Sequence, residues 1–386
     1  MKKMTGAIAF ACAGLLMAMM IAGCSGRSLE LPQERVRDVV IGENNQQDDS
    51  VNSPEFDRKR HVRYTGRIDW RDPDGPVLSW AGSSIALRFQ GSALTMKLVP
   101  KERSESWVNI KVDGGPPQKL YIDANTPVVT IAEGLNPDEE HTVEIYKRTE
   151  AMFGTIQLHG FELPDGGEFL APPARPERKI EIIGDSISAG SGNEGKDGDP
   201  NIAEHENNWL AYGALAARYL NAEHHTTAVS GIGLTVNYGD ERVNTMLDQY
   251  ERLNPLHEEP KWDFEQWTPD VVVINLGTND NNYEIDKDDF VAKYVGFVER
   301  VRSRYPEAHI FITLGPFQLK PVQDYIFDAF GVIRQAGDKR VHCFIFREAN
   351  RERDGMGETG HPNTITHALM ADQLVGEIME KTGWSK

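Results

Sequence analysis

The chain has 386 residues, of which 39% are hydrophobic and 26% are charged. This length exceeds that of a typical single hydrophobic core and favours two domains, and the composition is that of a soluble globular protein. The formal net charge of −18 argues against a nucleic-acid partner, because an acidic surface repels phosphates. A neutral partner or substrate fits this charge.

The N-terminus has the pattern of an export signal. "MKK" is followed by the apolar run "GAIAFACAGLLMAMMIAGC", and a positive start, an apolar middle and small residues at the end predict a signal peptide over residues 1–23. The end, "MIAGCS", resembles a bacterial lipoprotein signal. That resemblance implies acylation of Cys24 and an exported protein, lipid-anchored to the bacterial cell envelope at the outer membrane or cell surface. The alternatives are a plain signal peptide or an uncleaved anchor helix, for which the apolar stretch is near the lower length limit.

The following residues predict a tether and then an all-β domain. Residues 24–57 are polar, charged and poor in aromatic residues, which is typical of a flexible tether. Residues 58–165 contain short segments that alternate apolar and polar residues between turn residues, and they predict a β-sandwich of the jelly-roll type. The Pro- and Gly-rich stretch 166–178, "GGEFLAPPARPER", is expected to be a linker.

From residue 179 the pattern changes to alternating strands and helices. Strands are predicted at "KIEIIGDS", "HHTTAVSG", "PDVVVINLGTND", "HIFITLGPF" and "VHCFIF", of which "PDVVVINLGTND" is expected to be fully buried. Helical patterns lie between and after these strands. This alternation predicts an α/β domain over residues 179–386, with a parallel sheet covered by helices on both faces.

Four polar motifs follow strands or precede the last helix of this domain. They are Gly184–Ser186, Ser230–Gly233, Gly277–Asp280 and Glu358–Asn363. Each motif alone is weak, but sites form at the C-terminal ends of parallel strands, and together the motifs resemble the four blocks of the SGNH, or GDSL-like, hydrolases. The serine, glycine, asparagine and histidine of that family fall here on Ser186, Gly231, Asn279 and His361. The resemblance implies a flavodoxin-like, three-layer catalytic domain.

The chemistry of ester hydrolysis requires such a set. A serine hydroxyl is a weak nucleophile until a base removes its proton, so Ser186 needs His361 within hydrogen-bond reach. The oxyanion formed by attack on an ester needs preorganised donors. In the family these are the backbone N–H groups at the positions of Ser186 and Gly231 and the side-chain amide at Asn279. The resemblance implies no metal and no cofactor.

The residue that orients the histidine departs from the family pattern. The family usually has aspartate three residues before the histidine, and here that position is Glu358. Glutamate is longer but can accept the same hydrogen bond, so we expect Glu358 to complete the catalytic set. Asp354 or a backbone carbonyl oxygen are the alternatives.

The N-terminal region narrows the family. "YTGRID", "WAGSSIALRFQGSALTMKL" and "VEIYKRTEAMFGTIQLHGFEL" resemble carbohydrate esterase family 2, which pairs a jelly roll with an SGNH domain. This resemblance implies a serine esterase that removes acetyl groups from plant polysaccharides such as xylan and mannan, or from their oligosaccharides. Many members carry tryptophan directly before the histidine, where this chain has Gly360. We expect a different aromatic residue, Trp209, to contact the substrate.

Other functions remain open from the sequence. The alternatives are a lipase, a peptidoglycan O-acetyl esterase, or a glycan-binding surface lipoprotein without catalysis. The intact set of four SGNH residues argues against the last of these. The pairs His224–His225 and Glu204–His205 are expected to be solvated surface, because no further ligands accompany them in the sequence.

Overall fold

The structure is a computed structural model, and it describes residues 55–386. The predicted signal peptide, the lipidation site Cys24 and most of the predicted tether lie outside the described residues. Within residues 55–386, no helix is both long and apolar enough to span a membrane.

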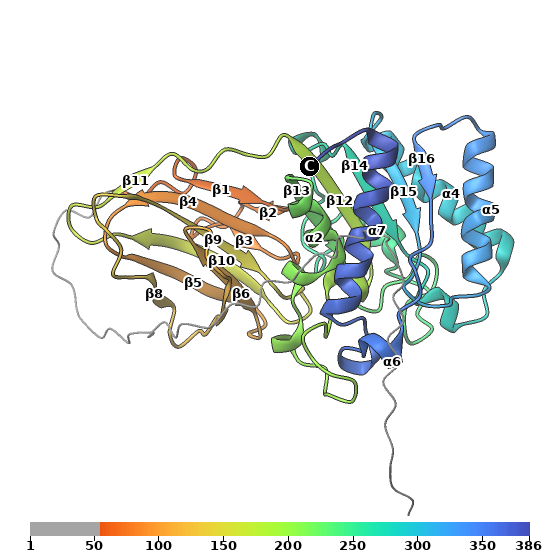
Figure 1. Ribbon diagram of the computed structural model, residues 1–386, viewed down its shortest axis with the longest axis horizontal. Coiled ribbons are helices and arrows are strands. Elements are labelled where there is room, and N and C mark those ends of the chain that lie inside the picture. Colours follow the sequence, from red (N-terminus) through yellow and green to blue (C-terminus); the bar gives the residue numbers. More distant parts are fainter. Residues whose placement is uncertain (1–54) are drawn as a thin grey trace, which may run out of the picture. The chain divides into compact units, whose positions relative to one another are not determined.

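The N-terminal half is a sandwich of two antiparallel sheets (Figure 1). One sheet has the order β1-β4-β9-β6-β7, with β11 also paired to β4, and the other has the order β2-β3-β10-β5-β8. The strands are β1 Val62–Thr65, β2 Ile68–Asp69, β3 Val77–Leu78, β4 Ser84–Gln90, β5 Leu94–Glu102, β6 Trp107–Val112, β7 Gln118–Tyr121, β8 Val128–Ala132, β9 Glu140–Lys147, β10 Thr155–Glu162 and β11 Glu168–Leu170. Neighbours such as β4 and β9 are distant in sequence, as in a jelly roll.

Alternation along the strands builds the core of the sandwich. In β5, Leu94, Met96 and Leu98 are buried while Lys97 between them is exposed, because successive side chains of a strand point to opposite faces. Leu87 of β4 and Val143 of β9 face each other in register and are fully buried. The predicted β-sandwich is therefore confirmed, but part of the predicted linker 166–178 is not a linker, since β11 pairs with β4 and its Phe169 is buried.

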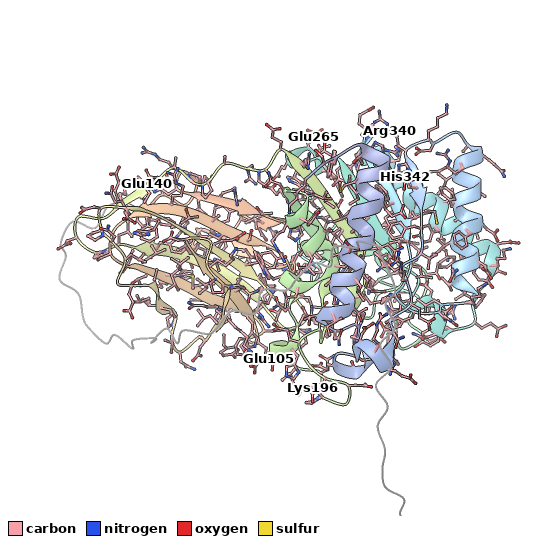
Figure 2. All side chains as sticks on the ribbon, in the orientation of Figure 1. Glu105, Glu140, Lys196, Glu265, Arg340 and His342 are labelled. Atoms are coloured by element: carbon pink, nitrogen blue, oxygen red, sulfur yellow. The ribbon has the colours of Figure 1, made fainter. Side chains whose placement is uncertain are left out.

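The C-terminal half contains a parallel sheet with the order β13-β12-β14-β15-β16. Numbered along the chain this is the order 2-1-3-4-5 of flavodoxin-like folds, as predicted. Its strands are β12 Arg178–Gly184, β13 Ala222–Ala228, β14 Val271–Asn275, β15 His309–Thr313 and β16 Val341–Cys343. Figure 2 shows Arg340 and His342 at the outermost strand β16.

Helices cover both faces of this sheet. The helices are α1 Ser186–Ala189, α2 Tyr212–Tyr219, α3 Met246–Gln249, α4 Lys287–Arg304, α5 Val322–Gln335, α6 Arg351–Asp354 and α7 Thr364–Thr382. α2 and α7 pack on one side of the sheet, and α4 and α5 pack on the other (Figure 1). Short 3-10 turns lie at Ala203–His205, Asn208–Leu210, Phe264–Gln266, Asp280–Asn282 and Glu358–Gly360.

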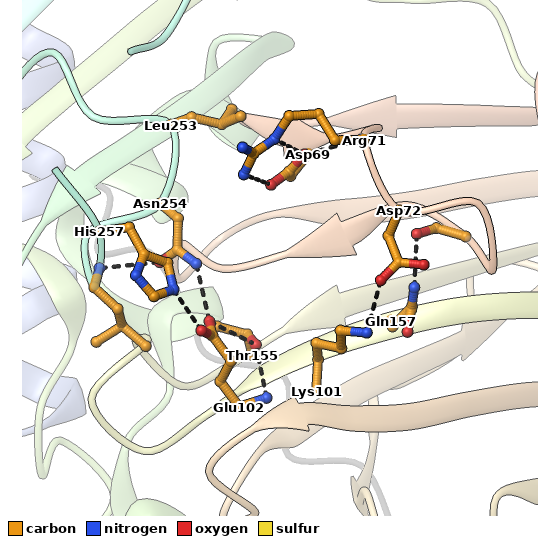
Figure 3. Close-up of polar contacts among 12 residues, drawn as sticks. Asp69, Arg71, Asp72, Lys101, Glu102, Thr155, Gln157, Leu253, Asn254 and His257 are labelled. Atoms are coloured by element: carbon orange, nitrogen blue, oxygen red, sulfur yellow. Dashed lines mark hydrogen bonds and ion pairs between the residues drawn. The ribbon is translucent and has the colours of Figure 1, made fainter. Parts of the chain in front are cut away.

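The sandwich and the α/β domain share a polar, buried boundary. Arg67 of the sandwich is 2% exposed and donates to Glu181 of β12 at 3.0 Å and to the carbonyl oxygen of Arg252 at 2.9 Å. Glu102, at the end of β5, accepts a hydrogen bond from the Asn254 side chain at 3.0 Å, and His257 also contacts it (Figure 3). Side chains of the first domain are thus part of the packing of the second.

Candidate active site

The connection from β12 to α1 presents Ser186. Gly184 ends β12, and a Cβ atom there would lie 2.1 Å from Ser188 Oγ, so a larger residue does not fit. Asp185 caps the helix that follows, accepting a hydrogen bond from the Ile187 N–H at 3.0 Å. Ser186, the first residue of α1, is only partly buried. The strand therefore ends in a tight turn that exposes the Ser186 hydroxyl.

His361 contacts this hydroxyl directly. Its Nε2 lies 2.9 Å from Ser186 Oγ, and its Nδ1 lies 3.1 Å from the carbonyl oxygen of Glu358. A carbonyl oxygen can only accept a hydrogen bond, so it fixes the proton on Nδ1 and leaves the lone pair of Nε2 facing Ser186. Burial lowers the pKa of His361 below its usual value. The imidazole is thus neutral near pH 7 and able to take the serine proton.

The carboxylate of Glu358 points away from His361. It is buried, lies 2.7 Å from His205 Nδ1, and accepts a hydrogen bond from the Ile202 N–H at 3.1 Å. Asp354 instead pairs with Arg353 at 2.6 Å. The expected carboxylate contact is not formed, and the structure has the backbone carbonyl, the third alternative, at Nδ1.

Three N–H groups are the candidate oxyanion donors of the site. The Ser186 N–H is at the start of α1, where helical N–H groups have no partner within the helix. Gly231 has φ +78°, a conformation that favours glycine. In the described part of the chain, no acceptor contacts the Gly231 N–H. Asn279 Nδ2 donates to the carbonyl oxygen of Ile232 at 2.8 Å, which leaves its second amide hydrogen available.

A buried carboxylate shapes the loop after Gly231. Asp280 accepts hydrogen bonds from the backbone N–H groups of Leu234, Thr235 and Val236 at 2.7–3.0 Å. Asp280 follows Asn279 in the chain, so the same turn supplies the amide and holds the loop that carries Gly231. The motif Gly277–Asp280 therefore has a structural role in addition to the chemical role that we expect for Asn279.

Tyr238 is a residue that the sequence analysis missed. Its ring is 72% exposed, and its backbone N–H donates to the carbonyl oxygen of Gly231 at 2.7 Å. A large exposed aromatic side chain thus stands beside the glycine of the site. The sequence offers little signal for it beyond its place seven residues after Gly231.

The structure places Trp209 at the boundary between the two domains. Its side chain is 8% exposed. The Arg218 guanidinium lies 3.8 Å and the Lys111 ammonium group 4.9 Å from the centroid of its ring. The ring also makes an edge-to-face contact with Tyr146. Trp209 lines pockets of about 300 and 490 Å³ at the domain boundary, whose linings do not include Ser186 or His361. These pockets give no support to the expected substrate contact of Trp209, which stays a prediction.

The histidine pair of β13 is also placed differently from expectation. His224 and His225 are buried at the domain boundary, not solvated. His225 stacks on Trp267 with ring centroids 3.6 Å apart and accepts a hydrogen bond from the Gly66 N–H, and burial lowers the pKa of His224 to about 3. Across residues 55–386, no group of three or more His, Cys, Asp or Glu side chains is arranged to hold a metal ion.

Comparisons with known proteins divide the chain as its structure does. The family described as "Carbohydrate esterase 2 N-terminal" matches residues 64–173, and the "GDSL-like Lipase/Acylhydrolase family" matches residues 182–369. The first match spans the sandwich, and the second spans the α/β domain with all four SGNH residues.

Similar proteins are known from bacteria. Cellulase/esterase CelE of Acetivibrio thermocellus is 39% identical over 329 residues, which cover 84% of this chain but 40% of CelE, so the chain spans less than half of that relative. An acetylxylan esterase / glucomannan deacetylase of Cellvibrio japonicus is 26% identical over 84% of this chain and 90% of its own length. The structure of a family two carbohydrate esterase from Clostridium thermocellum in complex with cellohexaose is 37% identical, with a TM-score of 0.78 over 84% of this chain and 100% of that one.

Proposed function

The chain belongs to carbohydrate esterase family 2, and we propose on that premise that it removes O-acetyl groups from plant-type polysaccharides, such as acetylated xylan or mannan, or from their oligosaccharides. The observation that carries the proposal is the 2.9 Å contact of Ser186 Oγ with His361 Nε2. Within residues 55–386, the Gly231 N–H contacts no acceptor, which leaves it free to bind an oxyanion. The activities named for the two bacterial relatives support the choice of substrate.

Acylation begins at the Ser186 hydroxyl. His361 Nε2 accepts the proton while Oγ attacks the acetyl carbonyl carbon, and the carbonyl oxygen becomes an oxyanion. The N–H groups of Ser186 and Gly231 and the amide of Asn279 donate to that oxyanion, and each such donor contributes on the order of 3 kcal/mol to lowering the barrier. His361 then gives its proton to the departing sugar oxygen, which leaves an acetyl group on Ser186.

Deacylation repeats these steps with water. His361 takes a proton from a water molecule while the water oxygen attacks the acetyl carbonyl carbon. The same donors bind the second oxyanion. Acetate then leaves as His361 returns the proton to Ser186 Oγ. The carbonyl oxygen of Glu358 keeps the imidazole in the required tautomer throughout. The described residues thus supply the nucleophile, the base and the oxyanion donors.

The sugar part of the substrate needs an apolar surface. The exposed ring of Tyr238 beside Gly231 offers a flat face to one side of a pyranose, a role that we assign to it. Tyr238→Ala is expected to raise KM for acetylated polysaccharide while changing turnover of 4-nitrophenyl acetate little.

Acetate release tests the proposal. Acetylated xylan, acetylated glucomannan and a series of 4-nitrophenyl esters of increasing acyl length are incubated with the wild type and with Ser186→Ala. We expect activity on acetyl esters only, highest on a glycan, and a loss of at least about 10³-fold in the variant. Activity that rises with acyl length would indicate a lipase, and glycan binding without turnover would indicate a binding protein.

We also propose that the protein is lipid-anchored to the cell envelope through Cys24, which lies outside the described residues. The pattern "MIAGCS" supports this proposal. Growth of an expressing bacterium with a labelled fatty acid tests it, because the label is expected on the wild type and absent from Cys24→Ala. An unlabelled wild-type protein released into the medium would contradict it.

A further inference from the structure

We propose that Glu150, a carboxylate of the N-terminal sandwich, is a positioning residue for the oxyanion hole of the α/β domain. The inference rests on the proposed esterase function and extends it, since it makes the sandwich part of the catalytic unit. None of the four sequence motifs includes Glu150, which lies in the connection between β9 and β10.

Glu150 holds the residue before Gly231. It is 2% exposed, its Oε2 accepts a hydrogen bond from the Ser230 N–H at 2.8 Å, and its Oε1 accepts one from the Ser230 hydroxyl. Both donors of Ser230 are therefore bound by one carboxylate. The Ser230 carbonyl carbon and the Gly231 nitrogen belong to one planar peptide unit, so holding Ser230 restricts the directions that the Gly231 N–H can take. On the other side of Gly231, its carbonyl oxygen accepts a hydrogen bond from the Tyr238 N–H at 2.7 Å, which restricts that direction further.

The same loop is held from its other end. Asp280 of the α/β domain binds the backbone of residues 234–236, and Glu150 of the sandwich binds Ser230. Gly231, between these anchors, has φ +78° and its N–H faces no acceptor in residues 55–386. A glycine can take many conformations, so its N–H stays preorganised only if its neighbours are fixed.

Glu150 is itself locked in place by buried charges. Its backbone N–H donates to the carboxylate of Glu206, and the ammonium group of Lys147, whose side chain is fully buried, donates to the carbonyl oxygen of Thr149. Burial raises the pKa of both Glu150 and Glu206 and lowers the pKa of Lys147. Apolar packing in place of a buried ionic cluster is often as stable or more stable, so stability alone does not account for this cluster, whereas a role in holding the loop does.

Two variants and a matched control test the role. Glu150→Ala removes both hydrogen bonds to Ser230, and Glu150→Gln keeps one acceptor oxygen. Glu102→Gln is the control, because Glu102 is also a sandwich carboxylate that contacts the α/β domain, through Asn254 and His257, and has no contact with residues 229–237 in the described structure (Figure 3).

The measurements distinguish binding of the oxyanion transition state from binding of the sugar in the ground state. For each protein we measure kcat and KM on 4-nitrophenyl acetate, inhibition by methylboronic acid, which forms a tetrahedral adduct with the serine, and binding of a deacetylated oligosaccharide. We expect kcat to fall about 10²-fold in Glu150→Ala and less in Glu150→Gln. Inhibition by the boronic acid should weaken in parallel, whereas oligosaccharide affinity and the control should stay within about twofold.

Other outcomes overturn the proposal. Folded Glu150 variants with kcat within threefold of the wild type would do so, and so would a loss of kcat that leaves boronic acid inhibition unchanged. If Glu150→Ala does not fold, Glu150→Gln and Ser230→Ala carry the test, since Ser230→Ala removes only the hydroxyl contact and should lower kcat severalfold. A wild-type protein that releases no acetate would instead refute the proposed function.

Discussion

A neutral group contacts the histidine that we propose as the catalytic base. Nδ1 of His361 faces the carbonyl oxygen of Glu358 at 3.1 Å, and Thr359 Oγ1 lies 3.0 Å from the same nitrogen. These contacts select the tautomer but stabilise the imidazolium less than a carboxylate would. Burial lowers the pKa of His361 below 6.5, and the hydrogen bond to the Glu358 carbonyl oxygen raises it only in part, so we expect the acid limb of the pH–activity profile to lie below pH 6.5.

Glu358→Gln tests the carbonyl assignment. The backbone carbonyl remains in the variant, and the amide can keep one of the contacts to His205 and Ile202, so we expect kcat on 4-nitrophenyl acetate to stay within about tenfold of the wild type. A carboxylate in a Ser-His-Asp set is worth about 10⁴-fold when it is replaced by its amide. Asp354→Asn is the matched control, with no expected effect. A loss of 10³-fold or more in Glu358→Gln would show that the carboxylate acts on His361.

The positions of the motifs along the chain predicted which residues meet, but the residue types did not predict how each side chain is oriented. Ser186 and His361 are in contact, as their places at the ends of elements predicted, because parallel strands deliver their C-terminal ends to one edge. The direction of the Glu358 side chain could not be predicted, since it depends on the packing of the loop that contains Ile202 and His205. Glu150 could not be found either, because its contact with Ser230 joins residues 80 positions apart.

Asp185, between β12 and α1, is both the N-cap of the helix and a buried carboxyl group. Asp185 is fully buried, one of its oxygens accepts from the Ile187 N–H, and no partner is found for the other in residues 55–386. Burial raises its pKa from 3.8 to about 7. Because the folded pKa is higher than the unfolded one, ionisation of Asp185 opposes folding, and this destabilisation grows from about pH 4 to pH 7 and is complete above pH 7.

Asp185→Asn is therefore expected to stabilise the protein in a pH-dependent way. Asparagine caps helices as well as aspartate does but carries no charge. The gain in the free energy of unfolding should be small at pH 4, rise to pH 7 and then level off at a value on the order of 4 kcal/mol. Urea unfolding at several pH values measures it. A gain that is independent of pH would mean that Asp185 does not titrate in the folded state.

Elements with a strong apolar signal were predicted best. β14 and β15 were recognised as strands, whereas the three-residue strand β11 was taken as linker because its neighbours are rich in proline and glycine. β13, "AEHHTTA", is polar in sequence yet all seven residues are buried. It is the edge strand of its sheet, and contacts such as Gly66 N–H to His225 and Tyr146 to His224 cover it from the sandwich.

At the scale of the whole molecule, the two domains are joined by buried polar contacts that neither could satisfy alone. The Arg67 guanidinium pairs with Glu181 of the α/β domain. It lies beside the ring of Trp80 in the sandwich and the rings of Tyr250, Trp262 and Phe264 in the α/β domain. Trp80 of the sandwich donates to the carbonyl oxygen of Leu253 at 2.8 Å. Separation would expose these groups and release the Glu150 anchor at the same time, so we expect the sandwich and the α/β domain to unfold in one transition.

Arg67→Met tests this coupling. The variant keeps apolar packing but leaves Glu181 buried without its cation and two carbonyl oxygens without a donor, a change that typically destabilises a protein by about 3–5 kcal/mol. Arg71→Met is the control, because Arg71 pairs with Asp69 at the surface (Figure 3) and should contribute less than about 1 kcal/mol. Adding Glu181→Gln to Arg67→Met should recover part of the loss, since it removes the unpaired charge. Urea unfolding followed by tryptophan fluorescence measures these changes, and two separate transitions in the wild type would show instead that the domains are stable independently.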